Sequence, residues 1–474
     1  MNIIRYNSFR WVNLFSRNSF FYKYGDECLE SDNGLCAYLN DKRLMVSKYN
    51  IIKHYDDNQT VIYNTLYDSI VILENKENDQ FNQYNMFKGK SGVIRSLYRL
   101  GILVLDSEDE TALMNLQNEE LVYNRKGIPS VTILPTQACN ARCQYCFAEH
   151  NTKYTMTQDT IFRLVEFMKA NFCEGDRVLL RWFGGEPLLA SDIINEIVDK
   201  INITFHGNLR YSSLMFTNGS LLDDKLIECA KNKWHMEKIQ LTLDGYAKEH
   251  NKRKSYLNEG VDYYNKTIID IGKLLDAGIK VDCRVNLDKD NIKQIDDICR
   301  DLKQYKSNAL FRPRFTILRP SDCGFNRFNY ITTNDLEWAY SIIYNKLIEY
   351  GFLKHIQDLI PCRQKESCIR KSINKVIIGS DGKLYKCLQQ VFDDDSAVGD
   401  LKNGIDYKKH MSCCRTPLRE QCKNCVYLPI CSGGCEAYWK LSQTENVLPC
   451  IREKYFINML LDMIHEWEIM KNVY

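Results

Sequence analysis

The stretch VTILPTQACNARCQYCF occupies residues 131–147 and joins an apolar, β-branched run to three closely spaced cysteines. The run at 131–136 has the composition of a buried β-strand. Cys139, Cys143 and Cys146 follow it in the spacing C-x-x-x-C-x-x-C. A structural zinc site takes four protein ligands, and no histidine or further cysteine at a suitable near spacing supplies the fourth. Three thiolates instead suit a 4Fe–4S cluster that keeps one iron open for an exogenous ligand.

From residue 131 onward, short β-rich runs alternate with longer stretches whose apolar residues recur at helical spacing. The predicted strands lie at 131–136, 178–183, 213–218, 238–243, 280–287 and within 311–319. Repeated strand–helix alternation favours an α/β fold of parallel strands joined by right-handed crossovers, either as an open Rossmann-type sheet or as a barrel. In both folds the functional residues are expected at the carboxyl ends of the strands.

Length, charge and hydropathy narrow the class of protein. A chain of 474 residues predicts two or three domains, and its formal net charge of +2 gives no field that favours nucleic acid or an anionic membrane. No signal peptide or membrane span is visible, so we expect a cytoplasmic protein. In that reducing compartment, clustered cysteines indicate metal ligands or catalytic thiols. The interleaved charges from Lys248 to Lys254 are interpreted as a solvated face.

The cysteine pattern and the motifs at the later strand ends resemble the radical S-adenosylmethionine (SAM) superfamily. GGEP at Gly184–Pro187, FTNG at Phe216–Gly219 and LTLDG at Leu241–Gly245 follow or end successive predicted strands, and RVN at Arg284–Asn286 lies on the fifth. One such motif would be weak evidence, but four in the right order are specific. The resemblance implies the family's partial (β/α)6 barrel.

The same resemblance implies roles for the residues around the cofactor. The three cysteines of the 131–147 stretch would be the catalytic residues, holding a cluster whose open iron chelates the amino and carboxylate groups of SAM. Tyr145 and Phe147 would lie near the adenine, although ordinary loop packing remains open for both. Thr242 replaces a serine that is common in the family and keeps the hydroxyl. The expected cofactor-binding residues are Tyr145, Phe147, Gly184, Gly185, Glu186, Asn218, Thr242, Asp244, Arg284 and Asn286.

A second group of cysteines runs from Cys362 to Cys450 with the spacing of the SPASM extension, which is found in radical enzymes that act on peptides and proteins. Eight thiolates satisfy two 4Fe–4S clusters at four cysteines each. By resemblance, an inner auxiliary cluster is held by Cys362, Cys368, Cys387 and Cys435. An outer auxiliary cluster is held by Cys422, Cys425, Cys431 and Cys450.

Two alternatives stay open for this tail. The same eight cysteines could instead provide the ligands of two zinc sites, with four cysteines at each site. Cys323, Cys413 and Cys414 have no place in the pattern; the last two are either spare, or one of them replaces a ligand.

The amino-terminal region predicts a small winged-helix-like unit, because a helical stretch from residue 92 is followed by Gly101 and an apolar strand. Such units often bind DNA, but this one lacks a strong basic stripe. In peptide-modifying radical enzymes a similar module binds the leader of a precursor peptide, often by adding a strand to its sheet. A purely structural cap is the alternative. The expected domains are a peptide-recognition domain at 1–115, a linker at 116–130, a radical SAM barrel at 131–352 and a SPASM domain at 353–474.

Taken together, the resemblance implies an anaerobic peptide maturase that abstracts hydrogen from a precursor peptide through a 5′-deoxyadenosyl radical and closes a thioether or carbon–carbon crosslink. Its partners would be a precursor peptide with a leader and an electron donor such as flavodoxin or ferredoxin. Anaerobic sulfatase maturation is the nearest alternative, but those enzymes typically place an Asp after the cysteine equivalent to Cys387, where this chain has Leu388. A non-catalytic iron–sulfur regulator or electron carrier is the alternative of another class.

Overall fold

The computed structural model describes most of the chain. The described residues are 1–5, 38–40, 42–55, 58–84, 91–123, 128–147, 154–319, 329–362, 368–391, 393–443 and 449–473. Cys323 lies outside them. Within these ranges no helix has the length and apolar character needed to cross a membrane.

An eight-stranded sheet forms the centre of the molecule, in the order β12-β11-β10-β9-β8-β7-β13-β14. The six strands from β7 to β12 are all parallel to their neighbours. They are β7 (Ser130–Ile133), β8 (Arg177–Trp182), β9 (Arg210–Thr217), β10 (Met236–Leu243), β11 (Lys280–Leu287) and β12 (Phe311–Ile317). The six predicted strands and their parallel arrangement are therefore confirmed.

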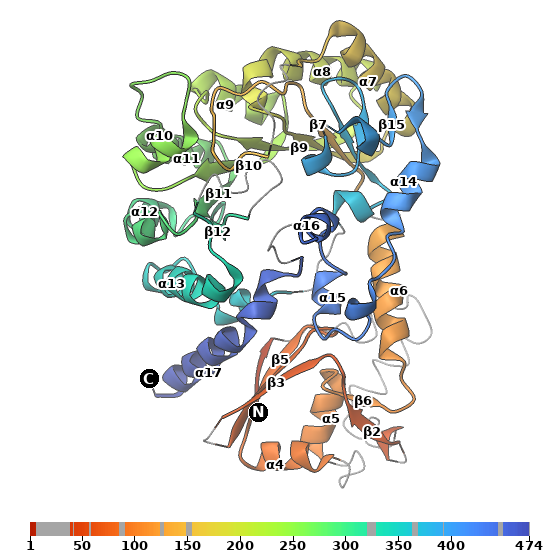
Figure 1. Ribbon diagram of the computed structural model, residues 1–474, viewed down its shortest axis with the longest axis vertical. Coiled ribbons are helices and arrows are strands. Elements are labelled where there is room, and N and C mark those ends of the chain that lie inside the picture. Colours follow the sequence, from red (N-terminus) through yellow and green to blue (C-terminus); the bar gives the residue numbers. More distant parts are fainter. Residues whose placement is uncertain are drawn as a thin grey trace.

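Helices connect these strands and cover the outside of the strand arc (Figure 1). They are α7 (Gln158–Asn171), α8 (Ser191–Thr204), α9 (Asp224–Asn232), α10 (Lys248–Lys254), α11 (Tyr263–Asp276), α12 (Ile295–Leu302) and α13 (Leu336–Glu349). In α7, Ile161, Leu164, Val165 and Met168 are buried, and the side chain of Thr157 caps the helix by accepting from the backbone N–H of Thr160. A hydrophobic stripe at helical spacing thus holds each such helix against the sheet.

The carboxyl-terminal part of the chain adds two strands to the same sheet. β13 (Lys375–Ile378) is parallel to β7, and β14 (Leu384–Tyr385) is antiparallel to β13. The turn between them needs a glycine, because Gly382 has a φ of +82°, a conformation that other residues rarely adopt. The barrel and the cysteine-rich tail therefore share one sheet.

The amino-terminal region forms a separate antiparallel sheet in the order β1-β5-β4-β3. Its strands are β1 (Asn2–Arg5), β3 (Asn50–His54), β4 (Gln59–Asn64) and β5 (Ser69–Glu74), and it carries the helices α4 (Lys76–Asn82) and α5 (Gly92–Arg99). A short ribbon pairs β2 (Leu44–Val46) with β6 (Leu103–Leu105). The predicted helix, the turn at Gly101 and the apolar strand thus appear as α5 and β6.

Most of the stretch expected as a linker is helical. Helix α6 (Glu110–Tyr123) leads from the amino-terminal sheet along one side of the molecule towards β7 (Figure 1). Near its end, the carbonyl of Val122 accepts from the backbone N–H of Ile373 at 3.1 Å, and the hydroxyl of Tyr123 accepts from Arg415 Nε at 2.8 Å. These contacts dock the helix on the cysteine-rich tail.

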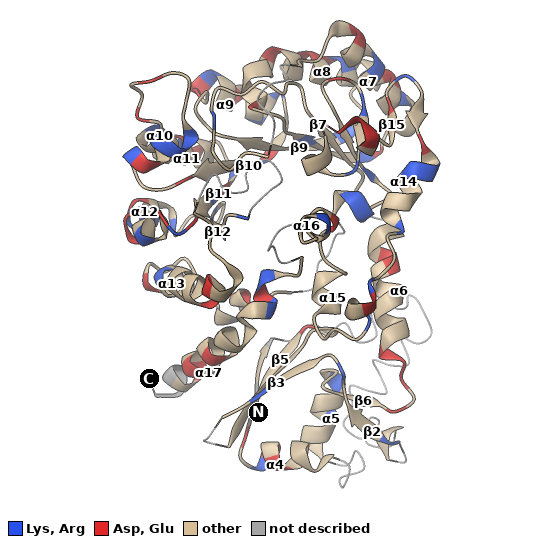
Figure 2. Cartoon of the chain, viewed as in Figure 1, with Lys and Arg blue, Asp and Glu red and all other residues tan. Residues whose placement is uncertain are grey.

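The tail consists of short elements and one long final helix. They are β15 (Gly399–Asp400), β16 (Gly404–Ile405), α14 (Tyr407–Cys414), α15 (Leu428–Cys431), α16 (Glu436–Leu441) and α17 (Ile457–Val473). Helix α17 returns to the amino-terminal sheet, where Tyr55 donates to Asp462 at 2.9 Å and stacks on His465. Lysine, arginine, aspartate and glutamate are mixed over the outer helices without a single-sign stripe in this view (Figure 2).

Candidate functional site

The three cysteines of the 131–147 stretch lie on a loop that follows β7, at the carboxyl edge of the parallel strands. The loop is fixed to the segment after α10, since Arg142 N donates to the carbonyl of Lys254 at 2.9 Å and Leu257 N donates to that of Asn140 at 2.9 Å. Burial raises the pKa of Cys139 and Cys143 to about 11. As free thiols both would stay protonated, so they are poor nucleophiles unless a metal displaces the proton.

Three cysteine thiols without a fourth protein ligand suit an iron–sulfur cluster better than a structural zinc ion. Within the described residues, no three His, Cys, Asp or Glu side chains converge as ligands of a single metal ion. The donor set at this loop therefore fits the open-iron cluster that the sequence predicts.

The turn at Gly184 and Gly185 brings the end of β8 against the backbone that precedes the cysteine loop. A Cβ at Gly184, whose φ is +133°, would lie 2.1 Å from the carbonyl oxygen of Thr136. At Gly185 it would lie 2.2 Å from that of Ala138. The N–H groups of Gly185 and Glu186 donate to these same two carbonyls at 3.1 and 2.8 Å. Only glycine allows this approach.

Glu186 is fully buried and ties β8 to β9. Its carboxylate accepts hydrogen bonds from Thr217 Oγ1 at 2.7 Å, Asn218 N at 2.8 Å and Leu188 N at 3.1 Å. Burial raises the pKa of this carboxyl, while the three hydrogen bonds oppose the rise. Both carboxylate oxygens of Glu186 therefore accept hydrogen bonds from the protein itself, and these bonds fix the end of the neighbouring strand β9.

Asn218 in turn connects that strand end to the cysteine loop. Its Nδ2 donates to Asn140 Oδ1 at 2.9 Å and lies 4.0 Å from the sulfur of Cys139. Its Oδ1 accepts from the hydroxyl of Ser220 at 2.6 Å. The structure therefore brings Asn218 beside the first expected cluster ligand.

A buried polar network joins Tyr145 to the ends of β10 and β11. The hydroxyl of Tyr145 donates to Asp244 Oδ2 at 2.6 Å, and Asn286 Nδ2 donates to Asp244 Oδ1 at 2.8 Å. Arg284 Nε donates to Asn286 Oδ1 at 2.9 Å. Four residues expected to bind the cofactor from sequence are thus in contact.

Lys254 completes this network. Its ammonium lies 3.3 Å from Asp244 and 2.5 Å from the hydroxyl of Thr242, and both members of the ion pair are buried. Burial alone would raise the pKa of Asp244, but Lys254, His250 and the hydrogen bonds from Tyr145 and Asn286 outweigh it. The carboxyl therefore titrates below its usual range and stays ionised.

The interpretation of Lys248 to Lys254 as a solvated face is wrong for three residues of α10. His250, Arg253 and Lys254 are 0%, 7% and 2% exposed. His250 Nδ1 accepts from Asp244 N at 3.1 Å, burial lowers its pKa to about 3, and Arg253 pairs with buried Asp288. These three residues stand at positions i, i+3 and i+4, which share one face of a helix. This spacing is the feature of the sequence from which a buried face of α10 could have been predicted.

Phe147 belongs to an aromatic row at the same edge. Its ring centroid lies 6.4 Å from that of Phe183, which follows β8, and the ring of Phe183 lies 5.4 Å from that of Phe216 on β9. The ring of Phe147 is inclined by only 16° to that of Phe183, whereas Phe183 and Phe216 meet edge to face at 65°. The three rings provide an apolar aromatic surface beside the cysteine loop, of the kind that a planar base can contact.

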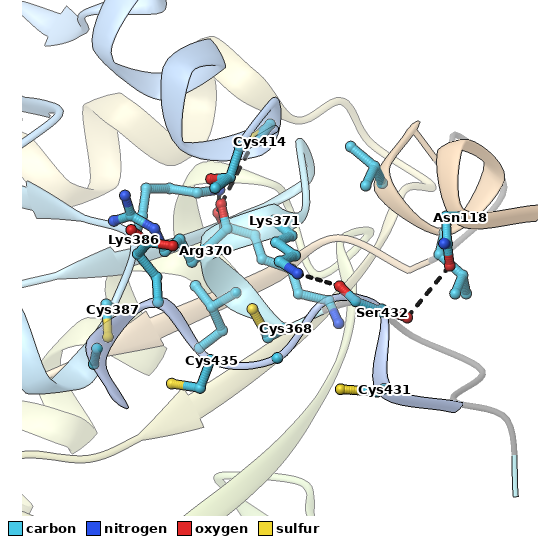
Figure 3. A pocket seen from close by; sticks show the side chains of 18 of the residues that line it. Asn118, Cys368, Arg370, Lys371, Lys386, Cys387, Cys414, Cys431, Ser432 and Cys435 are labelled. Atoms are coloured by element: carbon cyan, nitrogen blue, oxygen red, sulfur yellow. Dashed lines mark hydrogen bonds between the residues drawn. The ribbon is translucent and has the colours of Figure 1, made fainter. Parts of the chain in front are cut away.

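Several cysteines of the tail line a cavity of about 1180 Å³ beside α6 and the short helices, namely Cys368, Cys387, Cys414, Cys431, Cys435 and Cys450. Of the expected inner set, Cys368, Cys387 and Cys435 surround the same space (Figure 3). The pKa of Cys387 is raised by burial and further by Cys435 and Cys368, which reflects their proximity. Cys362, the fourth expected ligand, is exposed and directly precedes a stretch outside the described residues.

Cys431 of the expected outer set lies within electrostatic range of the other three members, Cys422, Cys425 and Cys450. The pKa of Cys431 is raised by burial and then by Cys450, Cys422 and Cys425. Cys422 and Cys425 also pack in a hydrophobic cluster with Tyr49, Leu66, Tyr67 and Leu428. The amino-terminal sheet region therefore covers one side of the outer set.

Charge in the cavity is strongly one-sided. Its positive lining residues are Arg181, Arg319, Arg370, Lys371, Lys375, Lys386 and Arg415, and its negative ones are Glu119 and Glu436. A 4Fe–4S cluster bound by four thiolates is a net anion whose potential depends on such surroundings. The positive lining therefore fits anionic clusters. This local excess of positive side chains contrasts with the net charge of the whole chain, which is only +2.

Of the three cysteines without a place in the pattern, the two that the structure describes, Cys413 and Cys414, are engaged in packing. Cys413 lies in the main hydrophobic core. Cys414 lines the cavity but points its sulfur at the carbonyl of Arg370, at 3.9 Å, away from the three inner cysteines in the view of Figure 3.

Comparison with known proteins agrees with this geometry. Residues 133–302 match the sequence profile of the Radical SAM superfamily. This stretch of the chain is therefore a radical SAM domain, the kind of domain that binds a 4Fe–4S cluster and SAM.

Among curated relatives, the radical SAM cyclopropyl synthase TigE of Paramaledivibacter caminithermalis is 23% identical over 268 residues, which span 48% of this chain and 54% of that enzyme. The cysteine-type anaerobic sulfatase-maturating enzyme of Clostridium novyi is 23% identical over 344 residues, or 65% of this chain and 87% of that enzyme. A solved structure, native anSMEcpe with bound AdoMet and Cp18Cys peptide, has a TM-score of 0.55 at 18% identity over 72% of this chain and 100% of that chain. This likeness supports the fold.

Proposed function

We propose that this radical SAM enzyme is a peptide maturase that forms an intramolecular crosslink, either a thioether or a carbon–carbon bond, in a precursor peptide. The observation that carries the proposal is the combination of two sites in one chain. One is the cysteine loop with its polar network at the carboxyl edge of the barrel. The other is the cationic cavity, which is lined by Cys368, Cys387 and Cys435 of the expected inner set and by Cys431 and Cys450 of the expected outer set.

At the barrel edge, Cys139, Cys143 and Cys146 would hold the first cluster, and SAM would bind beside it. When bound, this pair supplies a 5′-deoxyadenosyl radical that abstracts hydrogen from substrate carbon. The chain's own contribution is to orient SAM. The backbone of the Gly184–Gly185 turn lies against the loop, Arg284 supplies a cation, and the row at Phe147 offers a stacking surface.

The tail would remove an electron. Closing a crosslink takes one hydrogen atom, one proton and one further electron from the peptide, so an electron acceptor is needed. Two fully ligated auxiliary clusters, held by the inner and outer sets of cysteines, have no open iron and suit electron transfer. The excess of cations around them favours their more negative, reduced states.

The amino-terminal sheet would bind the leader of the precursor. Among described residues its edge strands β1 and β3 each pair on one side only, and Ile3 and Ile52 on them are exposed. An extended peptide can add a strand to such an edge. The contacts of Tyr49, Leu66 and Tyr67 with the region of Cys422 and Cys425 give this sheet a structural role as well.

Sulfatase maturation is the second candidate, favoured by the relative from Clostridium novyi. It needs a carboxylate beside the inner cluster as a proton acceptor. Leu388 occupies the position after Cys387, and the described residues that line the cavity include only Glu119 and Glu436 as carboxylates. Glu436 is already paired with Arg419 at 2.6 Å.

The test uses reduced, iron-loaded enzyme, SAM and synthetic peptides encoded by short reading frames beside the gene, with mass spectrometry as the readout. We expect a product lighter by two hydrogens, with fragment ions missing between the linked residues. A sulfatase-derived Cys or Ser peptide converted to formylglycine, with no crosslink in any neighbouring peptide, would favour the second candidate.

A further inference from the structure

Lys386 directly follows β14 and precedes Cys387, and it is 1% exposed. Its ammonium donates to the carbonyl oxygens of Ser372 and, at 2.6 Å, Lys375. Transfer of a charge from water to a protein interior costs several kcal/mol unless an opposite charge or strong hydrogen bonds offset it. Carbonyl dipoles offset part of this cost, and no carboxylate among the described residues forms an ion pair with Lys386.

The contrast with Lys254 makes the missing counter-charge evident. Lys254 is as deeply buried, and it lies 3.3 Å from the buried carboxylate of Asp244. Lys386 instead lines the cavity of the tail, where Cys368, Cys413 and Cys414 lie within electrostatic range of its ammonium. Among the described residues with the largest electrostatic effect on Lys386, those that can become negative are thiols.

The same ammonium also fixes the turn that carries Cys368. Ser372, whose carbonyl accepts from Lys386, donates its N–H to the carbonyl of Cys368 at 3.1 Å. One side chain thus contacts the turn of one expected inner ligand and is covalently adjacent to another, Cys387. Figure 3 labels Lys386, Cys368 and Cys387 among the residues that line the cavity.

We propose that Lys386 is a positioning residue and counter-charge for the inner auxiliary cluster, and that its ammonium raises the reduction potential of that cluster. This inference rests on the proposed function, which places an inner cluster on Cys362, Cys368, Cys387 and Cys435. A buried cation stabilises the state with the larger negative charge, and the reduced cluster carries one more electron than the oxidised cluster.

The test is a redox titration followed by electron paramagnetic resonance. The parent is the Cys139→Ala/Cys143→Ala/Cys146→Ala protein, in which about eight irons in the two auxiliary clusters remain. Lys386→Met in this background removes the charge and keeps the length of the side chain. We expect one of the two auxiliary potentials to fall and the other to stay, so that the outer cluster serves as an internal reference.

Lys383→Met is the matched control, because Lys383 lies on the same hairpin but at the surface, paired with Asp394 at 2.6 Å. It should move neither potential. A Lys386→Met protein with about eight irons and both potentials unchanged would overturn the inference.

If Lys386→Met loses about four irons and Lys386→Arg keeps them, a positive charge at this position is needed for the inner cluster to assemble, which would also support the inference. Equal loss in both variants would mean that packing, and not charge, is what the site needs, and would overturn it. A parent without auxiliary iron would refute the cluster assignment itself, and this inference with it.

Discussion

The hydroxyl of Tyr145 lies 2.6 Å from the carboxylate of Asp244 and joins the cysteine loop to the end of β10. Tyr145 belongs to the motif between the second and third cysteines, whereas Asp244 follows 99 residues later. Asp244 also accepts a hydrogen bond from Asn286 on β11 and forms an ion pair with Lys254 on α10. The contact with Tyr145 therefore fixes the cysteine loop to β10, β11 and α10.

Replacement of Tyr145 by Phe should therefore loosen the loop without emptying the site. Loss of a hydrogen bond to a charged acceptor is worth about 1.5–3 kcal/mol, so reductive SAM cleavage should fall by about tenfold or more. The assay is 5′-deoxyadenosine formation by protein with full iron content. Tyr211→Phe, on β9 and hydrogen-bonded to Asn202 and the carbonyl of Lys233, should cleave SAM at the normal rate. Equal rates in both variants would contradict the role of the contact.

The ion pair of Lys254 and Asp244 predicts a stability effect. Lys254→Met leaves a buried carboxylate without its cation and should cost about 3–5 kcal/mol in the free energy of unfolding, measured by urea denaturation. Lys254→Met/Asp244→Asn should recover part of this loss. Lys252→Met is the control, because Lys252 is less buried on the same helix and its loss should change stability by less than about 0.5 kcal/mol. A double variant no more stable than the single one would speak against the pair.

The outer set of cysteines predicts a separation of radical formation from product closure. Cys431→Ala should lose about four irons while SAM cleavage persists, because the barrel site is distinct. Loss of a cluster also removes a structural link, so circular dichroism must accompany the iron count. Cys413→Ala, which changes a cysteine packed in the core, should keep all iron. Retention of about twelve irons by Cys431→Ala would remove this residue from the ligand set.

The contact between the amino-terminal region and the outer set predicts a shielding effect. Leu428 is 1% exposed and packs with Leu66 and Tyr67 beside Cys422 and Cys425. Leu428→Ala should cost about 2–5 kcal/mol and speed the release of iron to a chelator. Leu164→Ala in α7, where Leu164 is also buried, should destabilise comparably without accelerating early iron release. Identical release curves for the two variants would show that the contact does not protect a cluster.

Much of the fold could be predicted from the chain alone, since each of the six parallel strands is a short β-rich run followed by a helical stripe. Residues of the cysteine, GGEP and LTLDG motifs also lie together at the carboxyl edge of the parallel strands, as the sequence predicts. What the sequence could not reveal depends on tertiary packing. Lys254 and Lys386 look like surface lysines until the loop and the cavity enclose them. Helix α6 has no strong apolar periodicity, and its docking on the tail, not its own pattern, makes it a helix within the fold.

The most direct test of the account is SAM cleavage by anaerobically reconstituted, reduced protein, measured together with its metal content. The account predicts about twelve irons and formation of 5′-deoxyadenosine, and a Cys139→Ala/Cys143→Ala/Cys146→Ala variant that loses about four irons and all cleavage. Stoichiometric zinc with little iron, and no 5′-deoxyadenosine from a folded protein, would contradict it.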